Sequence, residues 1–238
     1  MRKADIGLVE AVAAIVIQDR IVGWVKTAAA AAGAALPVMP VLKFTYISFG
    51  FSLFILLWVK LRGETWASFG LVVPAKWGRI IGYGLLLFAA QMAFGIFAQQ
   101  PVEQAVASFT GSGPNKASDV LGEVTGNLPL LLYLLPFVWL FAAFGEEFFF
   151  RGYLMNRFAQ FMGEGKLAWT FALIAQAILF GAAHAYQGAP GMVSVAIGGL
   201  ILGAGTLIWG RNLWPAIIGH GLADTLGFTL LYWGRLGH

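Results

Sequence analysis

Long apolar stretches dominate the pattern of hydrophobic and polar residues along this chain. A transmembrane helix needs about 20 mainly apolar residues, and it satisfies its own backbone hydrogen bonds in lipid. The alternating pattern of membrane barrel strands is absent from the sequence. The pattern therefore predicts an all-α, polytopic transmembrane helix bundle with six clear spans, near Val41–Val59, Ile80–Ala98, Leu128–Phe150, Leu167–His184, Gly191–Trp209 and Pro215–Trp233.

The region before Pro37 has a less regular spacing of apolar and charged residues. It could form a spanning helix, an interfacial amphipathic helix or both, and the bundle has seven or eight spans if this region crosses. Its apolar run Ile6–Ile17 resembles a signal peptide, but Glu10 interrupts the run, so we expect the segment to be retained. No repeat or linker divides the sequence, which predicts a single domain over residues 1–238.

The composition agrees with a membrane protein, because 59% of the residues are hydrophobic and only 11% are charged. A soluble domain carries roughly twice that charged fraction. The formal net charge of +4 comes from basic residues in short loops, so it indicates orientation in the membrane and not binding to nucleic acid. The chain has no cysteine, which excludes disulfides, thiolate zinc sites and cysteine nucleophiles.

Loop charge predicts the orientation of the bundle, because cytoplasmic loops carry the excess of Lys and Arg. Two segments with few basic residues, Gln99–Asn127 and Ala185–Pro190, are predicted to lie outside, and the first of them to form a mobile loop or a short surface helix. Three basic loops are predicted to be cytoplasmic, and they contain Lys60, Arg62, Lys76 and Arg79, then Arg151, Arg157 and Lys166, then Arg211.

Several ionisable residues interrupt or border the apolar stretches. Charge near the bilayer centre costs several kcal/mol, so such residues usually face a bundle interior and mark function. We expect them to meet around an intramembrane polar cavity, within a motif-bearing core of about residues 128–233. The six residues are Glu146, Glu147, Arg151, His184, His220 and Asp224.

The first motif is E-E-x-x-x-R. Glu147 and Arg151 are four residues apart, so they can pair on one helix face. Glu146 is rotated by about 100° from its neighbour, which leaves its carboxylate available as a base. The alternative is a charged cap where the helix leaves the membrane.

The other two motifs are F-x-x-x-H, from Phe180 to His184, and H-x-x-x-D, from His220 to Asp224. Taken alone, His184 could be a hydrogen-bonded interface residue, and His220 with Asp224 a self-satisfied pair that ties two helices together. Because three different helices each place acid–base groups in lipid, the three motifs together favour one shared site.

In this order the motifs resemble those of type II CAAX prenyl endopeptidases, within the CPBP (ABI) family of intramembrane proteases. The resemblance covers roughly Leu128–Trp233. It implies that Glu146 and His184 activate a water molecule and that His220 and the residue at 224 stabilise the developing oxyanion. Supporting roles fall to Glu147, Arg151 and Phe180.

The family usually has asparagine at the last motif position, where this chain has Asp224. An ionised aspartate has no proton to donate to an oxyanion. Burial could keep Asp224 protonated, it could ligate a metal, or it could orient His220, which we favour. We expect a mechanism without a cofactor. If a metal is bound, zinc is the candidate, with Glu146, His184, His220 and Asp224 as ligands.

The sequence thus predicts a multi-pass endopeptidase in a bacterial plasma membrane, with its cavity towards the cytoplasm. Its expected partners are the lipid bilayer and a membrane-associated peptide or protein, CAAX-like or otherwise lipid-linked. The sequence does not indicate an oligomeric state. The main alternative is a non-catalytic membrane binding protein, of the scaffold or bacteriocin-immunity type. A proton-coupled transporter is a further alternative, which no inverted repeat supports.

Overall fold

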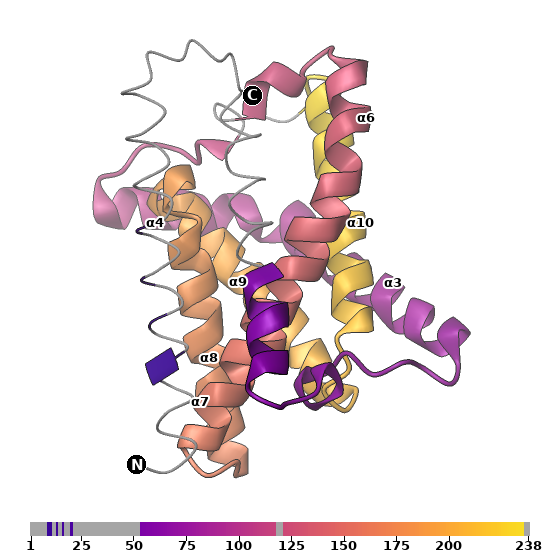
Figure 1. Cartoon of the computed structure of the whole chain (residues 1–238). Helices are drawn as coiled ribbons and strands as arrows, with labels where there is room; N and C mark the ends of the chain where they lie inside the picture. Colours follow the sequence, from indigo (N-terminus) through magenta and orange to yellow (C-terminus); the bar gives the residue numbers. More distant parts are fainter. Residues whose placement is uncertain are drawn as a thin grey trace.

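The computed structural model describes residues 9–10, 13, 16, 20, 53–117 and 121–235. Helices are the only regular elements in these ranges, which confirms the all-α class for this part of the chain (Figure 1). Residues 53–61 are helical. The elements that follow are η1 (Trp66–Phe69), α3 (Trp77–Phe97), α4 (Gln99–Thr110), η2 (Gly122–Val124), α6 (Leu128–Phe137), η3 (Val138–Leu154), α7 (Met155–Phe161), α8 (Lys166–Ala183), η4 (Ala185–Gln187), α9 (Gly188–Ile208) and α10 (Trp214–Tyr232).

Four helices of the described residues are long and apolar enough to cross a membrane: Trp77–Phe97, Leu128–Phe161, Lys166–Ala183 and Ala185–Ile208. They confirm four of the six predicted spans. The predicted span Pro215–Trp233 is a helix, α10, but His220 and Asp224 lower its apolar content and it is not among the four. Most of Val41–Val59 and the region before Pro37 lie outside the described residues, so the predicted total of six to eight spans is not confirmed.

The longest span is one continuous run of α6, η3 and α7, and it corrects the sequence analysis. It extends to Phe161 instead of ending at Phe150. Arg151 and Arg157 are therefore not loop residues: they are 0% and 5% exposed. Burial is tolerated because both guanidinium groups are paired with carboxylates, Arg151 with Glu147 and Arg157 with Glu64.

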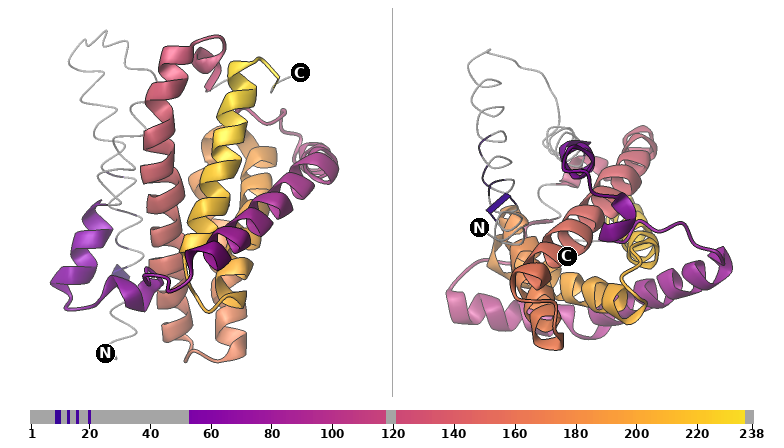
Figure 2. Two further views of the ribbon diagram at one scale, coloured as in Figure 1. Left: turned by 90° about the vertical axis from the view of Figure 1, so that its right-hand side faces the viewer. Right: turned by 60° about the horizontal axis from the view of Figure 1, so that its bottom comes forward.

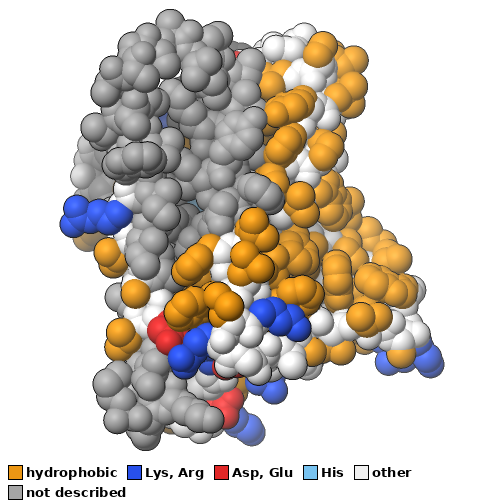
Figure 3. Space-filling model, viewed as in Figure 1, with side chains coloured by type: hydrophobic (Ala, Val, Ile, Leu, Met, Phe, Trp, Pro, Cys, Tyr) orange, Lys and Arg blue, Asp and Glu red, His pale blue; other side chains and the backbone are white. Residues whose placement is uncertain are grey.

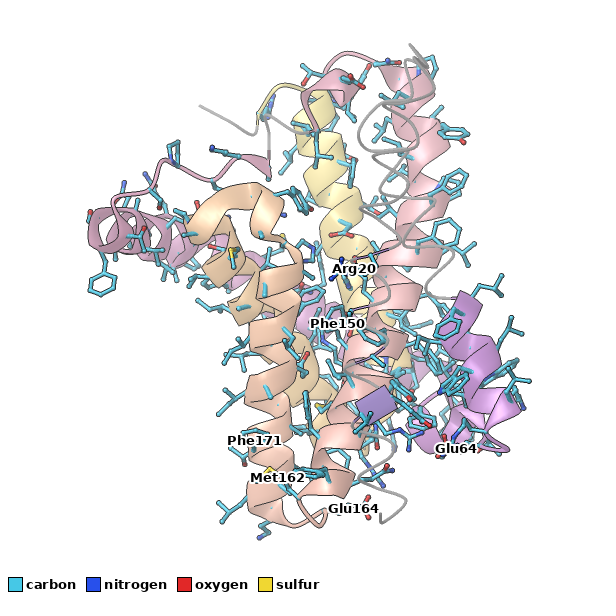
Figure 4. The ribbon with its side chains drawn as sticks, turned by 60° about the vertical axis from the view of Figure 1, so that its left-hand side comes forward. Arg20, Glu64, Phe150, Met162, Glu164 and Phe171 are labelled. Carbon is cyan, nitrogen blue, oxygen red and sulfur yellow. The ribbon has the colours of Figure 1, made fainter. Side chains whose placement is uncertain are left out.

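The middle of this run, η3, is a π-helix, a rare form that is frequently found at functional sites. Pro136, which has no N–H to donate, lies two residues before η3 begins. After α7 the chain turns at residues 162–165 and returns as α8; Figure 4 shows Met162 and Glu164 at this turn and Phe171 on α8.

The long run packs against α10 and α8, and α9 packs against α8. Figure 2 shows α6 and α10 side by side, with α3 crossing α10 obliquely. Hydrophobic side chains cover the face of the molecule over α3, α6 and α10, whereas Lys and Arg side chains gather in the lower part of the view (Figure 3). A bundle that presents such a face to lipid must place its polar groups inside or at its ends.

The predicted loop or surface helix at Gln99–Asn127 begins with a short helix, α4. Glu103 on α4 anchors this segment, because its Oε1 accepts hydrogen bonds from Gln99 Nε2 (2.9 Å), Asn115 Nδ2 (2.9 Å) and Ser194 Oγ (2.8 Å). Ser194 belongs to α9, so the anchor holds α4 and the segment after it against the bundle.

The contact between α3 and α10 depends on glycines. A Cβ added at Gly219 would lie 2.8 Å from Leu87 Cβ, and one at Gly84 would lie 2.6 Å from Ile218 Cγ2. Neither distance leaves room for a methyl group. The two helices therefore approach closely beside His220, as small residues allow helices to do in membranes.

We predict that Gly219→Ala destabilises the protein by about 1–3 kcal/mol, because the added methyl group must push α3 away from α10. Gly227→Ala is the matched control, since a Cβ at Gly227 on the same helix meets nothing within 4 Å. Equilibrium unfolding in detergent micelles measures both changes. Equal stability of the two variants would contradict the close packing.

Candidate active site

The three sequence motifs come together where η3, the end of α8 and α10 meet. Glu146, Glu147 and Arg151 lie on η3, Phe180 and His184 at the end of α8, and His220 and Asp224 on α10. Phe150 of η3 lies in the interior of the bundle (Figure 4), and its ring packs edge-on against Phe180 at 5.0 Å between centroids. The packing of this aromatic pair fixes η3 against α8 beside the ionisable groups.

A buried ion pair forms the centre of the cluster. Arg151 Nη1 donates to Glu147 Oε1 over 2.8 Å, and both side chains are 0% exposed. This confirms the pairing predicted from their spacing. The same Oε1 lies 2.9 Å from His220 Nδ1, which joins η3 to α10 across 73 positions of sequence. The sequence analysis missed this second contact, because no local spacing relates the two residues.

Phe180 packs against every cationic or imidazole group of the cluster. The Arg151 guanidinium lies 4.1 Å from the centroid of its ring, a cation–π contact. Its ring centroid is 4.8 Å from that of His184 and 6.2 Å from that of His220, both edge-on. A Cβ at Gly199 of α9 would lie 3.0 Å from the Phe180 ring, so α9 supports Phe180 from the other side.

His184 is held by its own helix. Its Nδ1 lies 2.8 Å from the carbonyl oxygen of Phe180, and a carbonyl can only accept a hydrogen bond. Nδ1 therefore carries the proton in the neutral ring, and the lone pair is on Nε2. This tautomer leaves Nε2 able to accept a proton or a hydrogen bond from water.

Glu146 differs from its neighbour Glu147 in both exposure and contacts. It is half-buried, and it makes no hydrogen bond or ion pair with any residue in the described part of the chain. Its carboxylate nevertheless interacts electrostatically with His220 and Asp224 of α10. Glu146 and His184, the expected pair, do not hydrogen-bond to each other in the described structure.

Asp224 contributes a weaker contact to His220 than we expected. Its Oδ2 lies 3.4 Å from His220 Nε2, which is longer than the 2.9 Å contact from Glu147 to the other nitrogen. Glu147 therefore orients the imidazole more firmly than Asp224 does. Trp139 of η3 fixes the same part of α10, since its Nε1 donates to Thr225 Oγ1 over 3.0 Å.

The arrangement of donors does not fit a metal ion. Each ring nitrogen of His220 faces a carboxylate oxygen, so neither offers its lone pair to a metal. Among the described residues, no group of three or more His, Cys, Asp or Glu side chains is placed to hold one. The mechanism without a cofactor stays a prediction.

Four apolar helices around buried acid–base groups define an integral membrane protein with a candidate hydrolytic site. Residues 128–226 match the family model described as "Rce1-like: Type II CAAX prenyl endopeptidase Rce1-like". The chain therefore carries an Rce1-like domain, consistent with the CPBP family of CAAX proteases, and the family points to a protease. The match contains all three motifs. No curated protein and no solved structure matches the chain significantly.

We predict that Arg151→Met costs about 3–5 kcal/mol of unfolding free energy, because it leaves the Glu147 carboxylate buried without its cation. The double variant Glu147→Gln/Arg151→Met should lose much less, since no buried charge is then uncompensated. Arg79→Met, at an exposed position of α3, is the matched control and should stay within about 0.5 kcal/mol of the wild type. If the Arg151→Met variant unfolds in detergent with the same free energy as the wild type, the buried pair is contradicted.

Proposed function

We propose that this protein is an intramembrane endopeptidase that hydrolyses a peptide bond in a membrane-associated protein or peptide. The observation that carries the proposal is the convergence of Glu146, His184 and the Glu147–Arg151–His220 cluster from three helices within an Rce1-like domain. Where helices are only packed together, their buried charges need to be paired. The Glu146 carboxylate has no such partner in the described structure, which distinguishes it from a purely structural residue.

In the proposed reaction, Glu146 and His184 Nε2 act on one water molecule. The water oxygen attacks the peptide carbonyl carbon while a proton of the water passes to the base. The carbonyl π electrons move onto oxygen and form a tetrahedral oxyanion. When the intermediate collapses, the C–N bond breaks and the amine leaves with the proton, so the base is regenerated.

The buried cluster of Glu147, Arg151 and His220 holds the site residues in a fixed arrangement. Arg151 holds Glu147, and Glu147 holds His220 through Nδ1, so the imidazole keeps one orientation within the site. Phe180 packs against this cluster and excludes water from it. Rigid support of this kind is what a catalytic site needs from the residues that surround it.

The proposed substrates are lipid-linked or otherwise membrane-associated chains cut near the membrane surface. A prenylated C-A-A-X end is the class that the family description names. We further propose that the protein lies in a bacterial plasma membrane with the turn between α7 and α8 on the cytoplasmic side. The chain then meets its substrate laterally in the bilayer.

Glu146→Gln keeps the size of the side chain and removes the base, so we predict a loss of about 10²–10⁴ in kcat. The assay uses purified protein in phospholipid vesicles with quenched fluorescent peptides, both farnesylated C-A-A-X peptides and the same peptides without the farnesyl group. Glu123→Gln, an exposed glutamate of η2, is the matched control and should hydrolyse at the wild-type rate.

Two results would reject this proposal in different ways. Wild-type turnover by Glu146→Gln eliminates the assigned base. In the second result, folded wild-type protein cleaves none of the peptides, and the Glu146→Gln and His184→Ala variants function in cells as the wild type does. The protein then binds a partner and does not cut it.

The orientation can be tested with single cysteines, because the chain has none. Gly165→Cys, in the turn between α7 and α8, should react with a membrane-impermeant maleimide only from the cytoplasmic side. Gly113→Cys, in the segment after α4, should react only from outside. A Cβ at either position meets nothing within 4 Å, so neither change should disturb the fold. Labelling of both positions from one side would overturn the proposed topology.

A further inference from the structure

His220 lies between two glycines that face two different helices. A Cβ added at Gly219 would lie 2.8 Å from Leu87 Cβ of α3. On the other side, a Cβ added at Gly221 would lie 2.6 Å from both Cε3 and Cζ3 of Trp139 on η3. Neither distance leaves room for a methyl group, so a neighbouring helix approaches the α10 backbone closely on each side of His220.

The indole of Trp139 also holds α10 through a hydrogen bond one turn further on. Its Nε1 donates to Thr225 Oγ1 over 3.0 Å, and Thr225 Oγ1 donates in turn to the Gly221 carbonyl over 2.6 Å. A hydroxyl has one proton, and Thr225 uses it within α10, so its oxygen accepts from the indole. One side chain of η3 thus contacts α10 at residues 221 and 225, which lie on the same helix face. Two points of contact restrict both the rotation of α10 about its axis and its sliding along η3.

The rotation of α10 decides whether His220 meets Glu147. His220 Nδ1 lies 2.9 Å from Glu147 Oε1. Successive residues of a helix are about 100° apart, so a small rotation of α10 carries the imidazole away from the carboxylate. Trp139 and Glu147 both belong to η3. The indole therefore positions α10 relative to the same helix that carries the partner of His220.

We propose that Trp139, which lies outside the three motifs, is a positioning residue for the proposed hydrolysis. Its indole packs on Gly221 and donates to Thr225, and in this way it keeps His220 in contact with Glu147 while the peptide bond is cut. The assignment rests on the proposed function. Trp139 acts through His220 and not on the substrate, and the indole exchanges no proton and forms no covalent bond.

Thr225→Val tests the hydrogen bond, because valine keeps the shape of threonine and removes the oxygen that accepts from Trp139. With the farnesylated C-A-A-X peptide in vesicles, kcat should fall about 10–100-fold while KM changes little, since a displaced catalytic group slows the chemical step more than it weakens binding. Thr225→Ser keeps the hydroxyl, so it should keep kcat within about twofold of the wild type.

Thr229→Val is the matched control on the same helix. Thr229 Oγ1 donates to the Thr225 carbonyl over 2.7 Å, so this variant also loses a hydrogen bond within α10 but leaves the indole bond intact. Its kcat should equal that of the wild type. The assignment is overturned if Thr225→Val keeps the wild-type kcat, or if Thr225→Ser or Thr229→Val loses as much as Thr225→Val does.

A double variant shows whether Trp139 and Thr225 act through one bond. Trp139→Phe removes the N–H that Thr225→Val leaves without an acceptor, so the kcat of the double variant should lie within about twofold of that of Trp139→Phe alone. Losses that multiply in the double variant would mean that the two residues act separately, which overturns the assignment. If melting temperatures show that Trp139→Phe does not fold, the comparison of valine with serine at 225 decides by itself.

A readout other than activity follows the imidazole itself. The chain has three histidines, so protein with isotope-labelled histidine gives few ring signals in NMR spectra, and His220→Asn assigns those of His220. Trp139→Phe and Thr225→Val should move these signals, whereas Thr229→Val should leave them in place. A fall in kcat with unmoved His220 signals would overturn positioning through His220.

The outcomes for Trp139 and for the proposed function differ. If wild-type protein cleaves the peptide, Glu146→Gln does not and Thr225→Val does at the wild-type rate, only the role of Trp139 fails. If folded wild-type protein cleaves neither the farnesylated peptide nor its unmodified form, the proposed function fails and the role of Trp139 in hydrolysis fails with it.

Discussion

The ion pair between Glu147 and Arg151 is the interaction on which the rest of the candidate site depends. Both side chains are fully buried in a span of the bundle, where an uncompensated charge would cost several kcal/mol. Both residues lie on η3, so the pair compensates the charge that this helix buries. Because Glu147 also contacts His220, the same carboxylate sets the position of α10.

The remaining contacts follow from that constraint. The Phe180 ring packs on the Arg151 guanidinium, which places the end of α8, and with it His184, beside the pair. Glu146, one position before Glu147, is left half-buried and interacts electrostatically with the ionisable groups of α10. The paired, rigid residues Glu147 and Arg151 thus support Glu146 and His184, the groups that move protons in the proposed reaction. A hydrolytic site requires such support around its reacting groups.

Much of this could be predicted from sequence because it depends on local pattern. Apolar length predicts the spans, and spacing of four predicts the pairing of Glu147 with Arg151. The sequence could not show that the long span continues to Phe161, since Arg157 indicates a loop until its partner Glu64, 93 positions away in sequence, is known. The contact of Glu147 with His220 depends on how helices pack, which no local spacing encodes. The π-helical form of η3 was equally invisible, although Pro136 is a signal that the regular hydrogen-bond pattern could change there.

The roles of the site residues rest on the family resemblance and on this geometry together. The match to the Rce1-like model covers residues 128–226. Of the described elements before that range, α3 packs against α10 and the α4 segment packs against α9. The substitution of aspartate for asparagine at 224 marks the point where this chain departs from the family pattern.

A double-mutant cycle on Glu147→Gln and His220→Asn tests most directly whether the motifs meet as described. The two residues are 73 positions apart in sequence, so only a contact in space can couple them. The structure predicts a coupling of about 1 kcal/mol or more in the free energy of unfolding. Additive effects of the two changes, within about 0.3–0.5 kcal/mol, would contradict the shared site.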